Sequence, residues 1–463
     1  MDPYYERLFS FNRNYGLRWN FFKALSFDYS VRANAVIDES DDFVEGDITT
    51  SAERDYILDQ ILNLGRMKNY NQNASLNLKL PFDKIPITDW ISSDVRYAVS
   101  YGWVTGSLNQ EDSLGNSFGN IINNSSDKSL TGKIDMVKLY NKVPFLKTIN
   151  TPARSNRPSS SVSKEEKAET SLSSSLIVGK GILRLLMAIR SVNFNYGIKQ
   201  TTNLSGFLPA PSLFGMDSLW SAPGWGFLFG EQDAAIRFTA AEQGWITQTP
   251  FLTSPFMQSS TRNLSFNASI EPFKGLKIQL NGKRTSAGRY QEIFRYNSEI
   301  QEFGSLTPSR SGSYSISYLT IKSAFEAQTQ MVNGVEFERS SAFDQFKENI
   351  DIISGRLSNS LEASGISDRY DTISQDILVP AFLAAYTGEN AENAPMGVFP
   401  RIPIPNWRID FAGLSKLPGL KDVFSSVNLT HSYRSIFSVN NYTNSLLYTE
   451  QMTLDNQLTD YPL

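Results

Sequence analysis

Apolar and polar residues alternate one by one over several long stretches of the chain, as in a β-strand with one apolar face. In residues 25–37, apolar side chains from Leu25 to Ile37 fill every second position, and polar ones fill all but one of the positions between them. Similar stripes occupy 70–80, 95–103, 264–270, 276–280 and 427–439. Strands average about 5–6 residues in globular proteins, whereas crossing a bilayer takes about 9–11. These lengths favour a membrane barrel over the alternative from periodicity alone, a soluble β-sandwich or β-helix.

A short unit of lysine, apolar residues and proline recurs between the stripes. It occupies 84–87, 142–147 and 416–421, with a looser copy at 272–277. Proline ends ladder pairing because it has no N–H, and the flanking lysines can snorkel at a membrane surface. In a barrel these turns are expected on the periplasmic side, with long connections outside at 39–68, 106–128 and 201–258. An ordinary Pro-Gly hairpin turn is the alternative for each copy.

Two segments depart from the strand pattern. Residues 149–180 are rich in Ser, Pro, Lys and Glu, which predicts a disordered periplasmic linker. Within 323–404, the 3,4,3,4 spacing from Phe343 to Leu357 predicts an amphipathic helix, and Ile377 to Tyr386 predicts a second short one. We therefore expect an α-rich insertion packed on or inside a barrel, with a separate soluble domain as the alternative.

The predicted fold is thus mainly β: a transmembrane antiparallel β-barrel fragment of about 10–12 long strands with a small α-helical insertion. The expected organisation is given by residue range. Residues 1–148 form barrel strands and loops, and residues 149–180 form the low-complexity periplasmic linker. Residues 181–322 form barrel strands with the long loop 201–258. Residues 323–404 form the α-rich insertion, and residues 405–463 form further barrel strands.

The directions of the expected strands do not alternate consistently along the chain. The strands expected at 311–321 and 405–413 would both run toward the periplasm, although only the insertion separates them. Either one crossing is hidden in 323–404, or 311–321 belongs to the insertion. An open set of strands also leaves two edges, which lipid does not tolerate. The pattern therefore predicts a piece of a larger barrel.

The composition agrees with a barrel wall that has one apolar face and one hydrated face. The chain has 463 residues, of which 12% are aromatic and 19% charged, with a net charge of −4. This near-neutral charge argues against a nucleic-acid binder. No apolar run reaches the roughly 18 residues of a spanning helix. Met1 is followed by Asp2-Pro3 and not by a signal peptide, which predicts either a cytosolic protein or a chain whose true start lies upstream.

Candidate chemistry is sparse. The chain has no cysteine and a single histidine, His431, which excludes thiol nucleophiles and multi-histidine metal sites. His431 sits on an apolar stripe, so a place at the rim of an aromatic belt is favoured over catalysis. Asp41, Asp42, Glu45 and Asp47 form a loose acidic cluster without EF-hand spacing. Glu165-Glu166 is interpreted as a solvated charge run. We predict no enzyme activity and no catalytic, cofactor-binding or metal residues.

Several aromatic residues are candidates for an interfacial girdle, with wall packing as the alternative. They are Trp19, Tyr101, Trp103, Trp407 and Tyr433.

An ordered series of motifs resembles the SprA/Sov family, the outer-membrane translocon of the type IX secretion system in Bacteroidota. The motifs are Asn34–Glu39, Leu114–Asn120, Leu139–Lys142 with Pro144–Lys147, Ala222–Gly230, Gly312–Thr320, Gln375–Gly388, Pro405–Arg408 and Leu417–Leu420. Any one of them is weak, but the series runs along nearly the whole chain. Proteins of that family are several times longer, so the resemblance implies a fragment of the later part of the barrel.

The resemblance implies that the chain helps to conduct folded cargo across the outer membrane at the cell surface of a Gram-negative bacterium, with a link to gliding motility in motile species. The implied partners are outer-membrane lipid, cargo proteins with C-terminal signal domains, a smaller outer-membrane barrel at a lateral opening and a periplasmic plug protein, but no nucleic acid. The alternatives are a porin or receptor-type barrel for small solutes, an outer-membrane protease that uses His431, and a soluble adhesin.

Overall fold

The structure, a computed structural model of the chain, is built around one large antiparallel sheet. The described residues are 9–38, 51–106, 111–150, 187–273, 275–324, 329–332, 335–338, 340–363, 374–396, 399–414, 419 and 423–443. Residues 151–180 of the predicted linker, the acidic residues of 41–47 and the turn residues 416–418, 420 and 421 lie outside this part of the chain, whereas residues 149 and 150 of the predicted linker end a helix.

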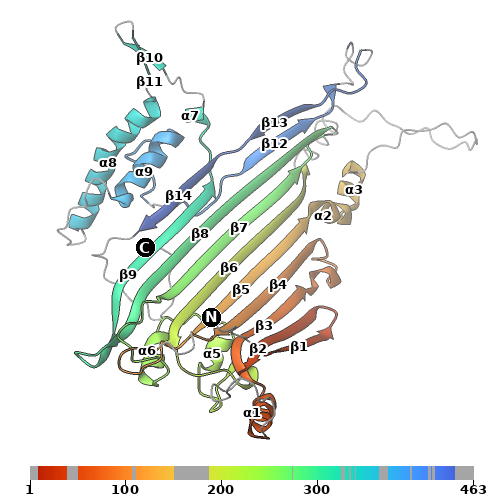
Figure 1. Cartoon of the computed structure of the whole chain (residues 1–463). Coiled ribbons are helices and arrows are strands. Elements are labelled where there is room, and N and C mark those ends of the chain that lie inside the picture. The colour runs from red at the N-terminus through yellow and green to blue at the C-terminus, as the bar shows by residue number, and fades with distance from the viewer. Residues whose placement is uncertain are drawn as a thin grey trace, which may run out of the picture.

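Twelve strands form the sheet, and each pairs with its neighbours in an antiparallel manner (Figure 1). The strands are β1 (Phe9–Phe22), β2 (Leu25–Ile37), β3 (Arg66–Leu80), β4 (Ile91–Val104), β5 (Asn120–Asp135), β6 (Ile189–Phe207), β7 (Phe256–Ile270), β8 (Leu276–Asn297), β9 (Glu302–Ser317), β12 (Asn406–Phe411), β13 (Leu429–Tyr433) and β14 (Ile436–Thr443). β1 to β8 follow one another across the sheet in sequence order. The mainly β prediction is therefore confirmed.

Several strands, among them β3, β4, β7 and β8, are longer than the apolar stripes that predict them. β8 has 22 residues and β6 has 19. All three predicted long connections are too wide as a result. β3 already starts at Arg66 within 39–68 and β5 at Asn120 within 106–128, while β6 and β7 extend into both ends of 201–258. Polar residues in these extensions hide the strand periodicity from the sequence.

The strands expected at 311–321 and 405–413 run in the same direction because β9 and β12 form one interrupted strand. Both pair with β8, β9 along its second half and β12 along its first half. Ile316 pairs with Arg284, and Asn406 pairs with Asn281, so residues 318–405 are inserted into the middle of one row. β13 and β14 divide the next row in the same way. Neither predicted alternative is correct, and the twelve strands make ten rows.

The break in the interrupted strand is closed by hydrogen bonds. The Ile404 N–H donates to the Ser317 carbonyl over 3.0 Å, and the Ser435 N–H donates to Oδ1 of Asn406 over 2.8 Å. The Lys283 N–H donates to the Ser317 hydroxyl over 3.1 Å. These bonds satisfy backbone groups that the insertion would otherwise leave unpaired.

The insertion is α-rich and lies at the sheet edge next to β9 and β14 (Figure 1). It contains α7 (Ile321–Ala324), the hairpin β10 (Thr329–Val332) and β11 (Val335–Glu338), α8 (Ser341–Ala363) and α9 (Gln375–Thr387). The predicted amphipathic helix is α8, and its Ile353 is buried with Ile377 and Ala381 of α9. Phe399 packs on Tyr314 of β9 with ring centroids 4.6 Å apart.

The two ends of the sheet differ. The turns with the Lys–Pro pattern at 84–87 and 142–147 lie at one end, where η1 (Pro81–Lys84), α2 (Met136–Lys142) and α3 (Pro144–Asn150) are found. At the opposite end lie α1 (Ser51–Leu62) and residues 208–255, which contain η2 (Leu213–Gly215), α5 (Trp225–Leu228) and α6 (Ile236–Glu242) (Figure 1). We call residues 208–255 the lobe. This segregation matches the predicted division into short and long connections.

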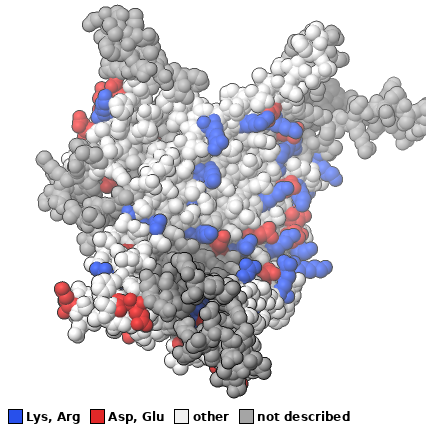
Figure 2. Space-filling view, viewed as in Figure 1, with Lys and Arg blue, Asp and Glu red and all other residues white. Residues whose placement is uncertain are grey.

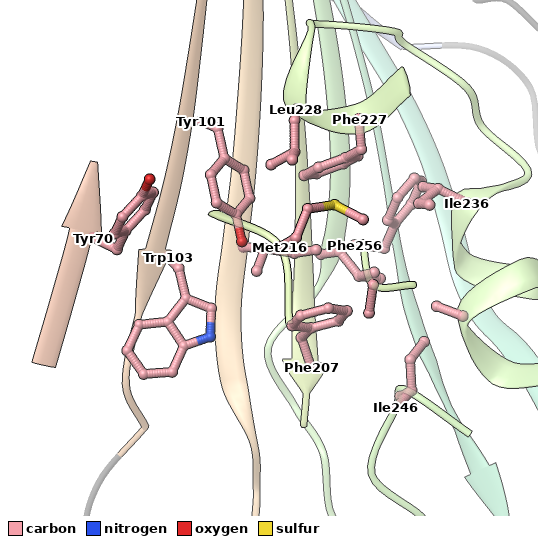
Figure 3. Packing of buried hydrophobic residues seen from close by; sticks show 14 of the residues in the cluster. Tyr70, Tyr101, Trp103, Phe207, Met216, Phe227, Leu228, Ile236, Ile246 and Phe256 are labelled. Atoms are coloured by element: carbon pink, nitrogen blue, oxygen red, sulfur yellow. The ribbon is translucent and has the colours of Figure 1, made fainter. Parts of the chain in front are cut away.

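The lobe and the sheet share the largest hydrophobic cluster of the described residues. Figure 3 shows Met216, Phe227 and Leu228 of the lobe among sheet residues such as Tyr101 and Phe256. All five side chains are at most 5% exposed. The Trp103 indole N–H also donates to the Pro209 carbonyl over 3.0 Å. The lobe is therefore a folded cap on one face of the sheet, not a loose loop.

The sheet is open. Among the described residues, β1 pairs with β2 alone, and β13 and β14 pair with β12 and β9 alone. β1 leaves Tyr15, Leu17 and Trp19 more than half exposed. Separately, no described helix has the length and apolarity needed to cross a membrane.

A close backbone approach at the lobe end of the sheet gives a first prediction. Gly119 has a φ of +69°, and a Cβ there would lie 2.6 Å from the carbonyl carbon of Gly206. Gly115 in the same connection has a φ of +81° but nothing within 4 Å of an added Cβ. We expect Gly119→Ala to lower the free energy of unfolding by about 1–3 kcal/mol more than Gly115→Ala, because only the former forces backbone apart. Denaturant unfolding of the two variants tests this, and equal costs would contradict it.

Candidate functional site: the two faces of the sheet

The strand registers assign the residues of the sheet to two chemically different faces. Successive side chains of a strand point to opposite faces, and directly paired residues share a face. One row of pairs contains Arg18, Asp28, Ser75, Ala98, Asp127 and Lys199. The adjacent row on the other face contains Trp19, Phe27, Leu76, Tyr97, Lys128 and Ile198. We call these the polar face and the apolar face.

Cross-strand hydrogen bonds and ion pairs line the polar face. Arg18 Nε lies 2.9 Å from a carboxylate oxygen of Asp28. The hydroxyls of Ser100 and Ser125 are 2.6 Å apart, as are those of Thr201 and Ser259. Acidic and basic side chains are mixed on this face, and Figure 2 shows them gathered over the part formed by the N-terminal strands. A surface of polar and charged side chains of this kind is readily solvated by water.

Three open grooves run along the polar face. One is lined by Asp94, Asn195, Asn267 and Lys283 with their neighbours, another by Arg18, Asp28, Arg96 and Lys199, and a third by Asn20, Asn77 and Lys79. Most lining side chains are Asn, Ser, Thr, Lys, Arg or Asp. None of the grooves is a closed apolar pocket of the kind that holds a small ligand.

The apolar face carries a continuous band of large side chains, which we call the apolar band. It contains Leu25, Phe27, Leu76, Leu78, Val95, Leu130, Phe194, Tyr196, Leu264, Phe266, Ile278, Leu280, Trp407 and Ile409. Glycines keep this surface smooth: the Phe194 ring occupies the space where a Cβ of Gly132 would lie, and Phe266 does the same at Gly282. No part of the lobe covers the residues of the band between Leu130 and Ile278 along the sheet, and all of them stay partly exposed.

The lobe covers the other half of the apolar face, and a buried network of polar side chains joins the lobe to the sheet there. Asn124 of β5 donates to the carbonyls of Phe227 and Glu231 over 2.9 and 2.7 Å. Gln232 of the lobe donates to Oδ1 of Asn124 and accepts from the Thr202 hydroxyl, both over 2.8 Å. Since unpaired buried amides cost free energy, this network fixes the lobe in one position.

A buried ion pair joins the lobe to β8. Arg237 of α6 contacts Glu292, and the two side chains are 3% and 1% exposed. Tyr290 donates to the second carboxylate oxygen of Glu292 over 2.6 Å. The guanidinium carbon of Arg237 also lies 5.0 Å from the centroid of the Phe256 ring. The sequence gives no signal for this pair, because the two residues lie far apart in the chain.

Of the candidate reactive residues singled out in the sequence, the structure describes only His431. His431 is exposed on β13 and pairs with Ile409, on the apolar face as its stripe indicates. Glu165-Glu166 and the acidic cluster 41–47 lie outside the described residues. Within the described part of the chain, no three His, Asp or Glu side chains gather as a metal site would require.

The aromatic residues proposed for an interfacial girdle fall into an exposed group and a buried group. Trp407 and Tyr433 stack on the apolar face with centroids 4.5 Å apart, and Trp19 is 56% exposed on β1. Tyr101 and Trp103 are only 1% and 3% exposed, because the lobe packs over them. For these two, the girdle interpretation is wrong and wall packing is correct.

Asp112, in the connection between β4 and β5, makes the local structure sensitive to acid. Desolvation raises the pKa of Asp112, but hydrogen bonds from Asn116, Thr249 and the Leu114 N–H outweigh it and bring the pKa to about 2. An unfolded Asp titrates near 3.9, so this stabilisation is present above about pH 4 and is lost as pH falls toward 2. We expect the protection factors of the amides of residues 112–118, which correct for the pH dependence of intrinsic exchange, to fall over that interval. Asp112→Asn should remove the dependence, and an unchanged profile in that variant would contradict the assignment.

Comparisons with known proteins leave the family open. No protein-family model matches the chain, and no curated protein matches it. What can be said of its role therefore rests on the two faces of the sheet, the lobe and the motifs of the chain itself.

Proposed function

We propose that the chain is a stretch of the wall of a very large outer-membrane β-barrel of the SprA/Sov type, through which folded cargo proteins leave the periplasm of a Gram-negative bacterium. The observation that carries the proposal is the pair of faces. Ten rows of long strands present a hydrated, charge-mixed surface on one side and a bare apolar band on the other. A barrel wall needs this division between lumen and lipid.

The slope of the apolar band supports a membrane wall. From β3 to β7 one row of pairs runs through Leu78, Val95, Leu130, Tyr196 and Leu264. On β8 the same row contains Arg284 instead of an apolar residue, and the apolar residue of that face, Leu280, comes earlier in the strand. The band is therefore oblique to the strands, as expected when strands are tilted by about 35–45° to the membrane normal.

The open edges and the insertion fit a wall wider than this sheet. Unpaired strand edges are not stable in lipid, so further strands must flank β1 and β13. Among the described residues, the insertion makes its ring contacts with Tyr314 and Phe437, which lie on the apolar face and not on the polar face. The lumen of such a wall would thus be left open for a large cargo, with the smaller barrel partner and the plug protein expected elsewhere.

Photo-crosslinking tests the proposal. Asn195 and Tyr196 are neighbours on β6, both exposed, one on each face. With a benzophenone amino acid at either position in secreting cells, we expect adducts with cargo proteins from position 195 and none from position 196. Absence of protein adducts at 195 in a correctly inserted variant would overturn the proposal and favour a barrel for small solutes.

A further inference from the structure

Charges of one sign border the apolar band. Within the register pairs of β4–β8, the charged residues on the apolar face are Lys128, Arg262, Arg284 and Glu292. Glu292 is buried beneath the lobe with Arg237. The outward charge at this level is therefore entirely basic, whereas the polar face of the same strands mixes acidic Asp94 with basic residues.

The three basic residues form a compact group, which we call the basic arc. Lys128 and Arg262 both pair with Ile198, one from each side, so they lie about 10 Å apart at ordinary strand spacing. Arg284 pairs with Leu264, two residues from Arg262, and is its diagonal neighbour at about 7–8 Å.

The surroundings place the basic arc at a boundary. On one side lie Leu130, Tyr196 and Leu264 of the apolar band, and on the other lie Ser126, Gln200 and Ser260. Two members are held in position: Lys128 Nζ lies 5.8 Å from the Tyr97 ring centroid, and Arg284 donates to the Arg401 carbonyl over 3.3 Å. Arg284 is also 5.8 Å from the Tyr314 ring centroid. Cations next to apolar surface are expected at the headgroup level of a membrane.

We infer that the basic arc binds the phosphate of an anionic lipid headgroup in the leaflet nearest the lobe. The inference rests on the proposed function in one respect, the contact of the apolar face with lipid. Arginine and lysine are the side chains best suited to phosphate, and Arg262 and Arg284 supply planar donor groups. The acyl chains of the same lipid would lie along Tyr196, Leu264 and Phe266. A bound lipid would thus fix the depth of the wall in the membrane.

Spin-labelled lipids provide the test, with the complete proposed barrel that contains this chain inserted in phosphatidylcholine vesicles. We expect labelled phosphatidylglycerol to be enriched at the protein relative to labelled phosphatidylcholine. Lys128→Gln, which changes an exposed side chain, should lower the relative association constant about fivefold. Lys128→Gln with Arg262→Gln should lower it about 25-fold on the same scale. The polar-face pair Arg96→Gln with Lys199→Gln is the matched control and should leave the selectivity unchanged.

Two results would overturn the inference: unchanged selectivity in the basic-arc variants, or loss of selectivity when inorganic phosphate is added at the same ionic strength, which would indicate a site for free phosphate. Cargo crosslinks at position 195 separate this failure from that of the proposed function. If crosslinks persist while selectivity is unaffected by the variants, only the lipid site is wrong. If crosslinks are absent, the proposed function fails whatever the lipids do.

Discussion

Arg237→Ala is expected to destabilise the docked lobe by about 3–5 kcal/mol, because it leaves Glu292 as a charge buried without its partner. The remaining hydrogen bond from Tyr290 does not neutralise that carboxylate. The lobe contains Trp220, Trp225 and Trp245, so its unfolding can be followed by tryptophan fluorescence during denaturation in detergent micelles.

Two controls define what this substitution measures. Arg237→Met combined with Glu292→Leu removes both charges at similar volume and should cost much less than the single change. Arg18→Ala breaks the ion pair with Asp28, whose members are 75% and 35% exposed, and should cost below about 1 kcal/mol. An Arg237→Ala protein that unfolds within about 1 kcal/mol of the native chain would show that the ion pair does not hold the lobe.

Phe266→Arg is the second substitution with a large expected effect. Phe266 lies within the apolar band, and a cation on the lipid side of a barrel costs about 2–4 kcal/mol near the bilayer midplane. Asn267→Arg places the same side chain at the next position, on the polar face, where we expect a change near zero. Urea unfolding of the complete proposed barrel in phosphatidylcholine vesicles measures both.

The ring of Phe266 also covers Gly282, so its loss has a packing component. Phe266→Leu isolates that component and should cost less than Phe266→Arg. If Asn267→Arg proves as costly as Phe266→Arg, the assignment of lipid and water to the two faces is wrong.

Alternation was enough to predict most of the sheet. The stripe 25–37 coincides with β2, and those at 70–80 and 95–103 fall within β3 and β4. The signal is strong there because one face of each strand is apolar almost throughout. It fails where the lobe covers the sheet, since Asn124, Thr202 and Gln258 are polar yet point to the apolar face. Their hydrogen bonds to the lobe and to one another replace the missing apolar contact.

Long-range pairing explains the rest of what the sequence did not show. The interruption of one strand by residues 318–405 depends on Asn406 continuing the register that Ser317 leaves, and no local pattern encodes that continuity. The Arg237–Glu292 pair and the basic arc likewise join residues from separate strands and helices. Their positions follow only once the registers are known, because a shift of one residue would exchange the two faces.

The central claim is that the polar face meets water and the apolar face meets lipid. The chain has no cysteine, so single cysteines can be placed along β7 at 263–268 without background labelling. In lipid vesicles, a water-soluble maleimide should modify positions 263, 265 and 267, and a fluorophore there should escape a lipid-dissolved quencher. Positions 264, 266 and 268 should show the reverse. Equal modification along the whole segment, or the opposite alternation, would contradict the account.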